Sequence, residues 1–373
     1  MTSNDMFEIF LVAPPGLEAA LCAEARSKGF RAAQIVKGGV TCQGDWPEVW
    51  RANLELRGAS RVLARFAAFR ALHLAQLDKR ARKVAWGEIL RPDVPVRVEA
   101  SCKASRIYHA GAATQRIERA VHETLGAPIA DEAEIQIKAR IEDDLCTLSI
   151  DTSGAPLHKR GHKAEVNKAP MRETLAALFL RQCGYDGSVP LLDPMCGSGT
   201  FVIEAAEIAA EIAPGRSRRF AFEHLVPFDP AAWHALRAAS KANRRPTSIR
   251  CYGSDRDAGA IAMSRANAER AGLSGSTSFE IRAIGDLTAP EGPPGLVIIN
   301  PPYGTRIGER KLLFPLYRTL GEKLRDGFAG WRVGLITTDA GLAAATDLPF
   351  GSPSPTVSHG GLSVILFQTS PLA

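Results

Sequence analysis

The stretch IINPPYG, residues 298–304, has the residue types needed to orient an exocyclic amine. An apolar run ends at Asn300, and Pro301, Pro302 and Tyr303 follow. Because the lone pair of a base amine is delocalised into the ring, such an amine is a poor nucleophile. The Asn300 side-chain oxygen and the Pro301 carbonyl, held rigid by Pro302, would accept its hydrogens and favour a pyramidal nitrogen. Tyr303 would offer a ring on which a flipped base can stack. The alternative is a proline-rich turn after a strand.

A second stretch, LLDPMCGSGT at residues 191–200, predicts a ligand-binding loop. Asp193 ends an apolar strand, a Gly-x-Gly turn follows, and a helix begins at once. Gly197 and Gly199 would let the backbone approach a ligand, and the helix N-terminus adds the positive end of a dipole. The pattern is neither a phosphate loop nor the GxGxxG of dinucleotide enzymes. Asp193 suits a ligand with an amine or a positive charge. The alternative is a glycine turn that serves packing alone.

Two further acids follow segments that would lie beside this loop. Asp255, in YGSDRD, ends the next apolar strand, where the carboxylates of nucleotide-binding sheets bind ribose hydroxyls. It is equally typical of a turn. It lies 62 positions after Asp193 instead of about 20, which predicts an insertion over residues 214–248. Asp286, in IRAIGDL, could face an adenine amino group.

A mainly parallel sheet would bring these residues together. After the polar, basic stretch 153–170, strand and helix patterns alternate, as is typical of such a sheet. Pro170 is placed where a helix would start, with Met171, Leu175, Leu178 and Phe179 on one helical face. The final segment, 356–369, predicts a hairpin. Residues 1–150 predict short α+β units, with hairpins at Gly38-Gly39 and at Asp143-Asp144 and a helical period over 46–69.

Length and composition favour a soluble protein of two or three domains, with 373 residues, 45% hydrophobic and 23% charged. No apolar run approaches the roughly 20 residues that span a bilayer, and the N-terminus lacks the features of a secretory signal. The seven cysteines are scattered and the histidines are not clustered. This favours reduced thiols in the cytoplasm, no disulfide framework and no metal site.

Charge is distributed unevenly along the chain, whose net charge is +6. Residues 51–120 carry 15 Lys and Arg against 6 Asp and Glu, whereas residues 121–151 carry 2 against 8. Such segregation indicates a basic face for a polyanion such as RNA. A solvated helix face is an equally good explanation of the charge alone.

Together, PLHKRGHK, APMRETLAA, LLDPMCGSGTFVIEAA, YGSDRDA and INPPYGTRIGE resemble the THUMP-domain, class I S-adenosylmethionine-dependent RNA guanine-N2 methyltransferases, which include RlmL-type and YpsC-like proteins. The resemblance covers nearly the whole chain. It implies an α/β fold with a Rossmann-like methyltransferase sheet at the C-terminus, preceded by small α+β modules. The implied divisions are a ferredoxin-like segment (1–58), a THUMP RNA-binding domain (59–155), a basic linker (156–170) and the methyltransferase domain (171–373). RlmL-type proteins carry a second methyltransferase domain, and we expect that second activity to be absent here.

The resemblance also implies roles for individual residues. The chain would methylate guanine N2 in RNA, with 23S ribosomal RNA as the substrate and transfer RNA as the alternative. Asn300, Pro301, Pro302 and Tyr303 would hold the target base. The residues implied for S-adenosylmethionine are Thr174, Asp193, Pro194, Met195, Cys196, Gly197, Ser198, Gly199, Thr200, Asp255, Arg256, Asp286 and Asn300. Thr174 would approach the methionine end, Asp255 the ribose and Asp286 the adenine. Lys159, Arg160 and Lys163 would contact RNA phosphates.

Two other functions stay open. NPPY serves any exocyclic amine, so adenine-N6 or cytosine-N4 methylation of DNA is one alternative, although the RETLAA and HKRG matches disfavour it. An RNA-binding protein without catalysis is the other, and Asp193, the two glycines and Asn300 disfavour that. Direct in-line methyl transfer depends on positioning and amine polarisation. It needs no strong general base, and the motif contains no His, Lys or Glu. We expect a monomer with no membrane partner.

Overall fold

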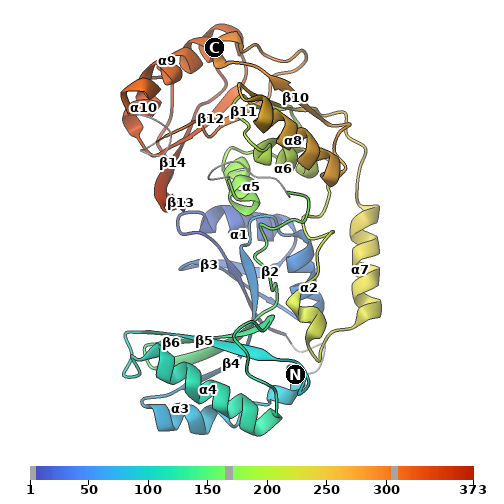
Figure 1. Cartoon of the computed structure of the whole chain (residues 1–373), viewed down its shortest axis with the longest axis vertical. Helices are drawn as coiled ribbons and strands as arrows, with labels where there is room; N and C mark the ends of the chain where they lie inside the picture. Colours follow the sequence, from blue (N-terminus) through green and yellow to red (C-terminus); the bar gives the residue numbers. More distant parts are fainter. Residues whose placement is uncertain (1–5, 164–170, 304–309) are drawn as a thin grey trace. The chain divides into compact units, whose positions relative to one another are not determined.

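The computed structural model of the chain describes residues 6–163, 171–303 and 310–373 (Figure 1). The predicted helix start at Pro170 lies outside these residues, as do the last residues of INPPYGTRIGE. The chain forms two compact units, each assembled from three separate segments. The first unit comprises Met1–Ala13, Ala25–Leu157 and Arg218–Ala239, and the second comprises Pro14–Glu24, His158–Ser217 and Ser240–Ala373.

A seven-stranded sheet with the order β2-β3-β1-β4-β7-β6-β5 forms the centre of the first unit. Its neighbouring strands are antiparallel except β5 and β6, which are parallel. Its strands are β1 (Phe7–Val12), β2 (Arg31–Val36), β3 (Gly39–Gly44), β4 (Arg61–Arg70), β5 (Val96–Lys103), β6 (Ile135–Glu142) and β7 (Leu145–Asp151). The helices of this half of the sequence are α1 (Glu18–Ser27), α2 (Trp46–Glu55), α3 (Leu74–Ala81), α4 (Ala110–Leu125) and the short η1 (Trp86–Glu88).

Both predicted hairpins of this unit are present. The β2–β3 turn has Gly38 at φ +81°, a left-handed conformation that glycine adopts without steric cost. The β6–β7 turn has Asp143 and Asp144 at φ +50° and +61°. Aspartate tolerates this region better than most residues because its short side chain can bond locally.

The helical period predicted over residues 46–69 is wrong beyond Glu55. Asp45 caps α2 by accepting a hydrogen bond from the Glu48 amide at 3.1 Å, and the helix ends at Leu56. Residues Arg61–Arg70 form strand β4, which pairs with β1 on one side and β7 on the other. Its apolar residues fit a period of 2 as well as a period of 3.6, so the two neighbouring strands decide its conformation.

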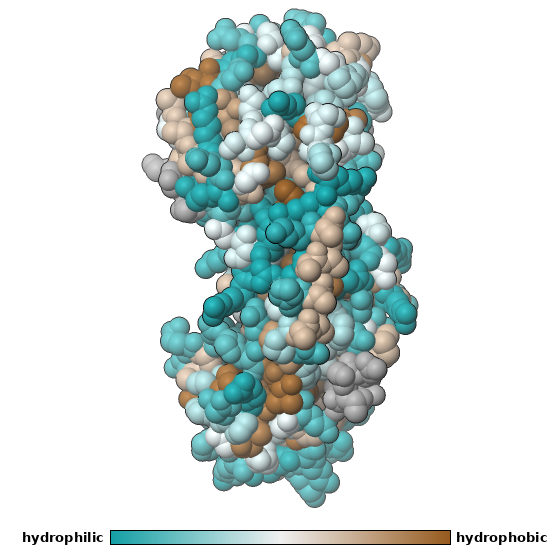
Figure 2. All heavy atoms as spheres, turned by 90° about the vertical axis from the view of Figure 1, so that its right-hand side faces the viewer, coloured by the Kyte–Doolittle hydropathy of each residue, from teal (hydrophilic) through white to brown (hydrophobic). Residues whose placement is uncertain are grey.

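Part of the predicted insertion belongs to the first unit. The insertion contains the helices η2 (Ala221–His224) and α7 (Pro230–Ala242), and the first unit includes η2 and α7 as far as Ala239. Phe222 lies in an aromatic cluster. The centroid of its ring is 6.1 Å from that of Trp50 in α2, 5.8 Å from that of Phe228 and 5.1 Å from that of Trp233. The insertion therefore completes a hydrophobic core with α2, which lies about 170 residues earlier in the chain. The outer face of α7 is rich in exposed alanine, and Figure 2 shows it as a weakly apolar ridge.

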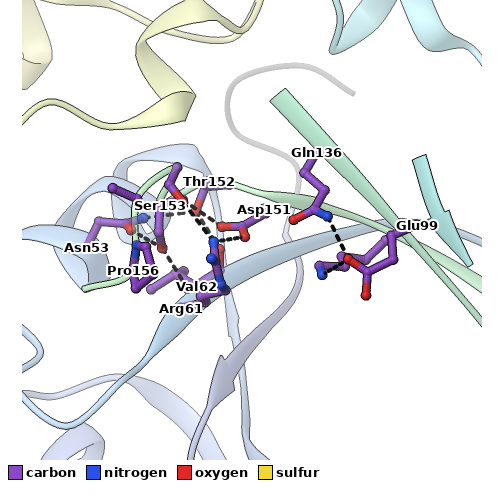
Figure 3. A network of polar contacts seen from close by, with 12 residues as sticks. Asn53, Arg61, Val62, Glu99, Gln136, Asp151, Thr152, Ser153 and Pro156 are labelled. Carbon is purple, nitrogen blue, oxygen red and sulfur yellow. Dashed lines mark hydrogen bonds and ion pairs between the residues drawn. The ribbon is translucent and has the colours of Figure 1, made fainter. Parts of the chain in front are cut away.

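A buried polar network fixes the end of β7 (Figure 3). The Asn53 amide donates to the Thr152 hydroxyl at 2.9 Å, and the Ser153 hydroxyl donates to the Asn53 side-chain oxygen at 2.7 Å. Arg61 pairs with the buried Asp151 beside them. Since α2 lies in the ferredoxin-like segment implied by the sequence and Thr152 at the end of the implied THUMP module, these bonds hold the two parts together as one body.

The second unit contains a mixed sheet with the order β10-β9-β8-β11-β12-β14-β13. Strands β8 to β12 are parallel, and β14 is antiparallel to both neighbours, forming the predicted C-terminal hairpin with β13. The strands are β8 (Leu191–Asp193), β9 (Cys251–Asp255), β10 (Thr277–Ile281), β11 (Leu296–Ile299), β12 (Arg332–Thr337), β13 (Val357–His359) and β14 (Leu362–Gln368). The helices are α5 (Glu173–Gln182), α6 (Thr200–Ala209), α8 (Ala258–Ala271), α9 (Arg310–Gly327), α10 (Ala340–Ala344) and η3 (Ile284–Asp286).

The predicted parallel sheet with alternating helices is thus confirmed. In the described parts of the chain, every helix is too short or too polar to cross a membrane.

Candidate active site

The carboxyl ends of β8, β9 and β11 bring three of the predicted polar residues to one edge of the second sheet. Leu191 and Leu192 pair with Leu296 and Val297 of β11, which leaves Asp193 level with Ile298 and two residues short of Asn300. On the other side Asp193 pairs with Gly253 of β9, two residues before Asp255. A residue in a strand advances about 3.3 Å. Asp193 therefore lies between the strands that carry Asp255 and Asn300, about 7 Å further back along the sheet.

The loop after β8 is held in a conformation that glycine makes possible. The Asp193 carboxylate accepts a hydrogen bond from the Met195 amide at 3.1 Å, and Asp255 accepts one from the Gly197 amide at 3.1 Å. Gly199 has φ +81° and caps α6, and a Cβ there would lie 3.1 Å from the Ser264 hydroxyl. A Cβ on Gly197 would meet nothing within 4 Å. The backbone is thus open at Gly197 and closely packed at Gly199.

Two side chains of α8, which the sequence analysis missed, hold this loop from behind. The Ser264 hydroxyl donates to the Gly197 carbonyl at 2.8 Å, and the Asn267 amide donates to the Ser198 carbonyl at 3.1 Å. Both residues are fully buried. They share the inward face of α8 with Ala260, Ile261 and Ala268. Polar residues on the apolar face of a helix were the signal that could have identified them.

Asp193 is buried without a cationic partner among the described residues. Burial raises the pKa of its carboxyl to about 8, and the neighbouring Asp255 carboxylate acts in the same direction. The hydrogen bond from the Met195 amide opposes this shift. A carboxylate in such a position is stabilised by an added positive charge. The site therefore suits a ligand that brings an ammonium group.

The remaining residues predicted to bind the cofactor lie in or near this loop and differ in how far they are buried. Pro194, Cys196, Ser198 and Thr200 are buried, Met195 is half-buried, and burial raises the pKa of the Cys196 thiol. Asp255 is half-buried, while Arg256 and Asp286 are exposed.

Thr174 is buried in the first turn of α5. The Lys163 ammonium donates to the Thr200 hydroxyl and to the Met171 carbonyl, both at 2.9 Å, and lies 3.3 Å from the Glu173 carboxylate. Lys163 thus ties the start of α5 to the start of α6, beside the glycine loop. Burial lowers the pKa of Lys163, and Glu173 opposes that shift.

The Asn300 side chain at this edge contains an unsatisfied hydrogen-bond acceptor. Its oxygen, Oδ1, is buried and has no hydrogen-bond partner within the described residues. An unsatisfied buried acceptor costs about 1–3 kcal/mol, so such an atom in a site needs an explanation. It is satisfied when a ligand brings an N–H or O–H donor.

Pro302 and Tyr303, which follow Asn300, are packed against the rest of the second unit. Tyr303 is only 8% exposed, so its ring does not present the open stacking face that we expected. The Tyr317 hydroxyl of α9 lies 3.4 Å from the Pro302 carbonyl oxygen and 3.2 Å from the Thr337 hydroxyl. Tyr317 was not identified from the sequence. An aromatic residue on the apolar face of a helix gives no sign that its hydroxyl will meet a loop about 15 residues earlier.

Two of the three cations predicted to contact phosphate are not on the surface. Arg160 is 2% exposed, and its Nε lies 3.0 Å from a carboxylate oxygen of the fully buried Glu204 in α6. The Lys163 side chain is 9% exposed and makes the contacts described above. Lys159 is exposed. In this structure, therefore, Arg160 and Lys163 are positioned to hold the glycine loop and α6. Their charged groups are buried and are not exposed for contact with RNA phosphates.

No group of three His, Cys, Asp or Glu side chains in the described segments is placed to hold a metal ion. All seven cysteines are free thiols.

Comparisons with known proteins match residues 160–352 to the RMKL-like methyltransferase domain and residues 8–63 to the RlmL ferredoxin-like domain. The chain is 36% identical over 359 residues to the ribosomal RNA large subunit methyltransferase K/L of Chromohalobacter salexigens, covering 91% of this chain and 49% of that protein. It therefore spans about half the length of that relative.

The chain is also 30% identical over 368 residues to slr0064 of Synechocystis sp., named as a candidate RNA methyltransferase, with 96% of this chain and 95% of that protein covered. Among solved structures, SMU.472, a candidate methyltransferase in complex with SAH, has a TM-score of 0.89 and 27% identity and covers 99% of both chains.

Proposed function

Because the chain belongs to the RMKL-like methyltransferase family, we propose that it transfers a methyl group from S-adenosylmethionine to the exocyclic N2 of a guanine in RNA. The cofactor is S-adenosylmethionine, since a homologue that matches the whole chain was solved with the demethylated product SAH. The Asn300 side-chain oxygen, buried and without a hydrogen-bond partner in the described part of the chain, is the observation that carries the choice of an amine as the methyl acceptor.

The cofactor would occupy the edge formed by β8, β9 and the glycine loop. Asp193, which is buried and has no cationic partner within the described residues, would receive the methionine ammonium. Asp255, which already accepts a bond from the Gly197 amide, has its other oxygen turned to the Asp257 amide at 3.0 Å and would bind the ribose with its remaining lone pairs. Thr174 and Asp286 are proposed for the methionine and adenine ends.

The methyl group is carried on a sulfonium, a good leaving group, so the protein's task is to position the amine in line with it. The Asn300 oxygen and the Pro301 carbonyl would each accept one N–H of the guanine amine, which turns the nitrogen lone pair toward the methyl group. The Tyr317 hydroxyl would fix the next carbonyl, that of Pro302, and so the direction of the whole loop. Nitrogen acquires the methyl group, the carbon–sulfur bond breaks, and one amine proton leaves to water. Such positioning contributes most of the rate.

RNA is the proposed substrate because the two relatives found by sequence carry RNA in their names and because residues 51–120 carry 15 Lys and Arg against 6 Asp and Glu. Ribosomal RNA is favoured over transfer RNA by the name of the K/L relative. Exposed Lys159 is the proposed phosphate contact among the three predicted cations.

Methylation of unmodified RNA by the purified protein tests this function. The protein is incubated with S-adenosylmethionine and with ribosomal or transfer RNA from cells that lack its gene, and the digested nucleosides are analysed by mass spectrometry. We expect N2-methylguanosine in ribosomal RNA. Its appearance in transfer RNA alone would select the other substrate. A methylated adenosine or cytidine would contradict the guanine assignment, and bound cofactor without any methylated nucleoside would contradict catalysis.

A further inference from the structure

The loop of residues 103–109, between β5 and α4, has a firmly held backbone. The Arg106 amide donates to the Asp144 carboxylate at 2.8 Å, and the Asp144 amide donates to the Ser105 hydroxyl at 3.0 Å. Ile107 is buried as an apolar anchor. At the end of the loop, the His109 ring accepts a hydrogen bond from the Ala112 amide at 2.9 Å and caps α4. Four contacts within seven residues leave this loop little freedom.

The two largest side chains of this loop, those of Arg106 and Tyr108, are nevertheless exposed to solvent. Tyr108 is 86% exposed, more than any other large hydrophobic side chain in the described part of the chain. Arg106 is exposed as well, and no ion pair to it is present among those residues. A single exposed aromatic residue needs no explanation. A rigid loop that exposes an aromatic ring and, two positions before it, a guanidinium with no ion pair among the described residues has the composition of a binding site.

Further cations lie at the same end of the first sheet. Four residues at register positions opposite one another form one row across the sheet. In the order of the strands β5, β6, β7 and β4 they are Lys103, Glu142, Leu145 and Arg70. Glu142 lies 3.3 Å from the Lys103 ammonium.

Lys37, from the β2–β3 turn, also reaches this row. Its pKa is lowered chiefly because the neighbouring Lys103 side chain carries the same charge. Two adjacent ammonium groups are better tolerated when an anion lies between them. The chain leaves β5 at Lys103 and enters the loop that carries Arg106 and Tyr108, so these cations lie at the end of the sheet from which the loop departs.

We propose that the Tyr108 surface, defined as Arg70, Lys103, Arg106 and Tyr108, binds an unpaired segment of RNA by stacking one base on the Tyr108 ring and by placing the adjoining phosphates on the three cations. Aromatic rings beside cations are the usual means of binding single strands, because every base offers a flat face. In a duplex those faces are already stacked on each other, so a protruding ring has nothing to cover. The inference rests on the proposed RNA substrate, but it concerns a surface of the first unit and involves neither Asn300 nor the glycine loop.

Binding of a fluorescein-labelled RNA of 12 nucleotides to the full-length protein tests this proposal, with the same strand annealed to its complement as the second probe. Tyr108→Ala should weaken binding of the single strand about 5- to 100-fold and that of the duplex by less than about twofold. Tyr108→Trp, which keeps a flat ring, should bind within about twofold of the wild type. Arg106→Ala should weaken both probes and lower the slope of log affinity against log salt by about one. Arg119→Ala, which removes an exposed cation of α4 that pairs with Glu123, is the matched control and should change neither.

Each contrary outcome has a defined meaning. If Tyr108→Ala binds the single strand as tightly as the wild type, the proposal is wrong even when the enzyme methylates RNA. If Tyr108→Ala weakens single strand and duplex equally, the ring does not stack on a base. If the wild type binds neither probe, this surface is not an RNA site. No cofactor is needed for this measurement, so a failure of the guanine-N2 assignment leaves it unaffected.

Discussion

The Tyr317 hydroxyl connects the loop after Asn300 to strand β12, since it lies 3.4 Å from the Pro302 carbonyl and 3.2 Å from the Thr337 hydroxyl. A phenol has one proton, so both contacts are satisfied when Thr337 donates to Tyr317 and Tyr317 donates to Pro302. The Thr337 oxygen in turn accepts from the Asp339 amide at 3.3 Å. Burial raises the pKa of Tyr317, which keeps its hydroxyl protonated as a donor. The three residues form one directed chain that ends at the proposed catalytic loop.

Tyr317→Phe should therefore slow methyl transfer without affecting cofactor binding. Removing a neutral hydrogen bond costs about 1 kcal/mol, which corresponds to a loss of about fivefold in kcat, with the KM for S-adenosylmethionine unchanged. Thr337→Ser, which keeps the hydroxyl, should restore most of the rate that Thr337→Val loses. A Tyr317→Phe enzyme with wild-type kcat would show that the hydroxyl does not orient the loop.

The charge state of Asp193 should make the cofactor-free protein less stable as pH rises. An unfolded carboxyl loses its proton near pH 4, whereas burial raises the folded pKa of Asp193 to about 8. Between these values the unfolded state binds fewer protons, so this residue lowers the free energy of unfolding progressively from pH 4 to 8, by a few kcal/mol in all.

Asp193→Asn removes that dependence while keeping an oxygen that can accept from Met195. We expect its melting temperature to exceed that of the wild type at pH 8.5 by more than at pH 5. Adding S-adenosylmethionine at pH 8 should raise the wild-type melting temperature and leave that of Asp193→Asn unchanged. Parallel pH profiles for the two proteins would contradict the assignment of the shifted group.

Replacing Arg160 should lower stability strongly, whereas replacing its neighbour Lys159 should hardly change it. Arg160 and Glu204 are both buried, and removing one member of such a pair leaves the other charged and uncompensated, at a cost of about 3–5 kcal/mol. Arg160→Met should lower the free energy of unfolding in urea by this amount, and a second change, Glu204→Leu, should recover most of it. Lys159→Met, at the exposed neighbour, is the matched control and should change stability by less than about 0.5 kcal/mol. Equal stability of the two single variants would show that the buried pair contributes nothing.

The sequence predicted those features that depend on local pattern. The strand ending at Asp193 and the helix that begins after Gly199 follow from apolar runs and glycine, and the structure has both where they were expected. The role proposed for Asn300 was likewise inferred from its neighbours in the sequence. Each of these features is encoded within about ten residues.

Features that depend on distant partners could not be predicted. Residues Arg61–Arg70 become a strand because β1 and β7 lie beside them. Arg160, in a basic and polar stretch, was expected in solvent because Glu204, the carboxylate that buries it, comes 44 residues later. Two glutamates, Glu204 and Glu207, inside the otherwise apolar segment FVIEAAEIA were the available signal, since a buried carboxylate needs a cation.

Asn300→Ala gives the most direct test of the proposed chemistry. The fold should be unaffected, because Oδ1 of Asn300 makes no hydrogen bond within the described residues and its loss leaves no other group there unpaired. Affinity for S-adenosylmethionine and for RNA should change little, since the oxygen would act chiefly when the amine becomes pyramidal. Losing one such positioned acceptor costs roughly 3 kcal/mol in the transition state, or on the order of a hundredfold in rate.

Single-turnover measurements at saturating RNA and cofactor isolate this step from binding. Asn300→Asp is the informative companion to Asn300→Ala, because it keeps an acceptor at the same place and adds a negative charge near Asp193 and Asp255. We expect Asn300→Asp to transfer methyl faster than Asn300→Ala, despite weaker cofactor binding, if the acceptor is what matters. If Asn300→Ala retains the wild-type single-turnover rate, the unpartnered oxygen does not orient the amine, and the acceptor atoms must be sought elsewhere along this edge.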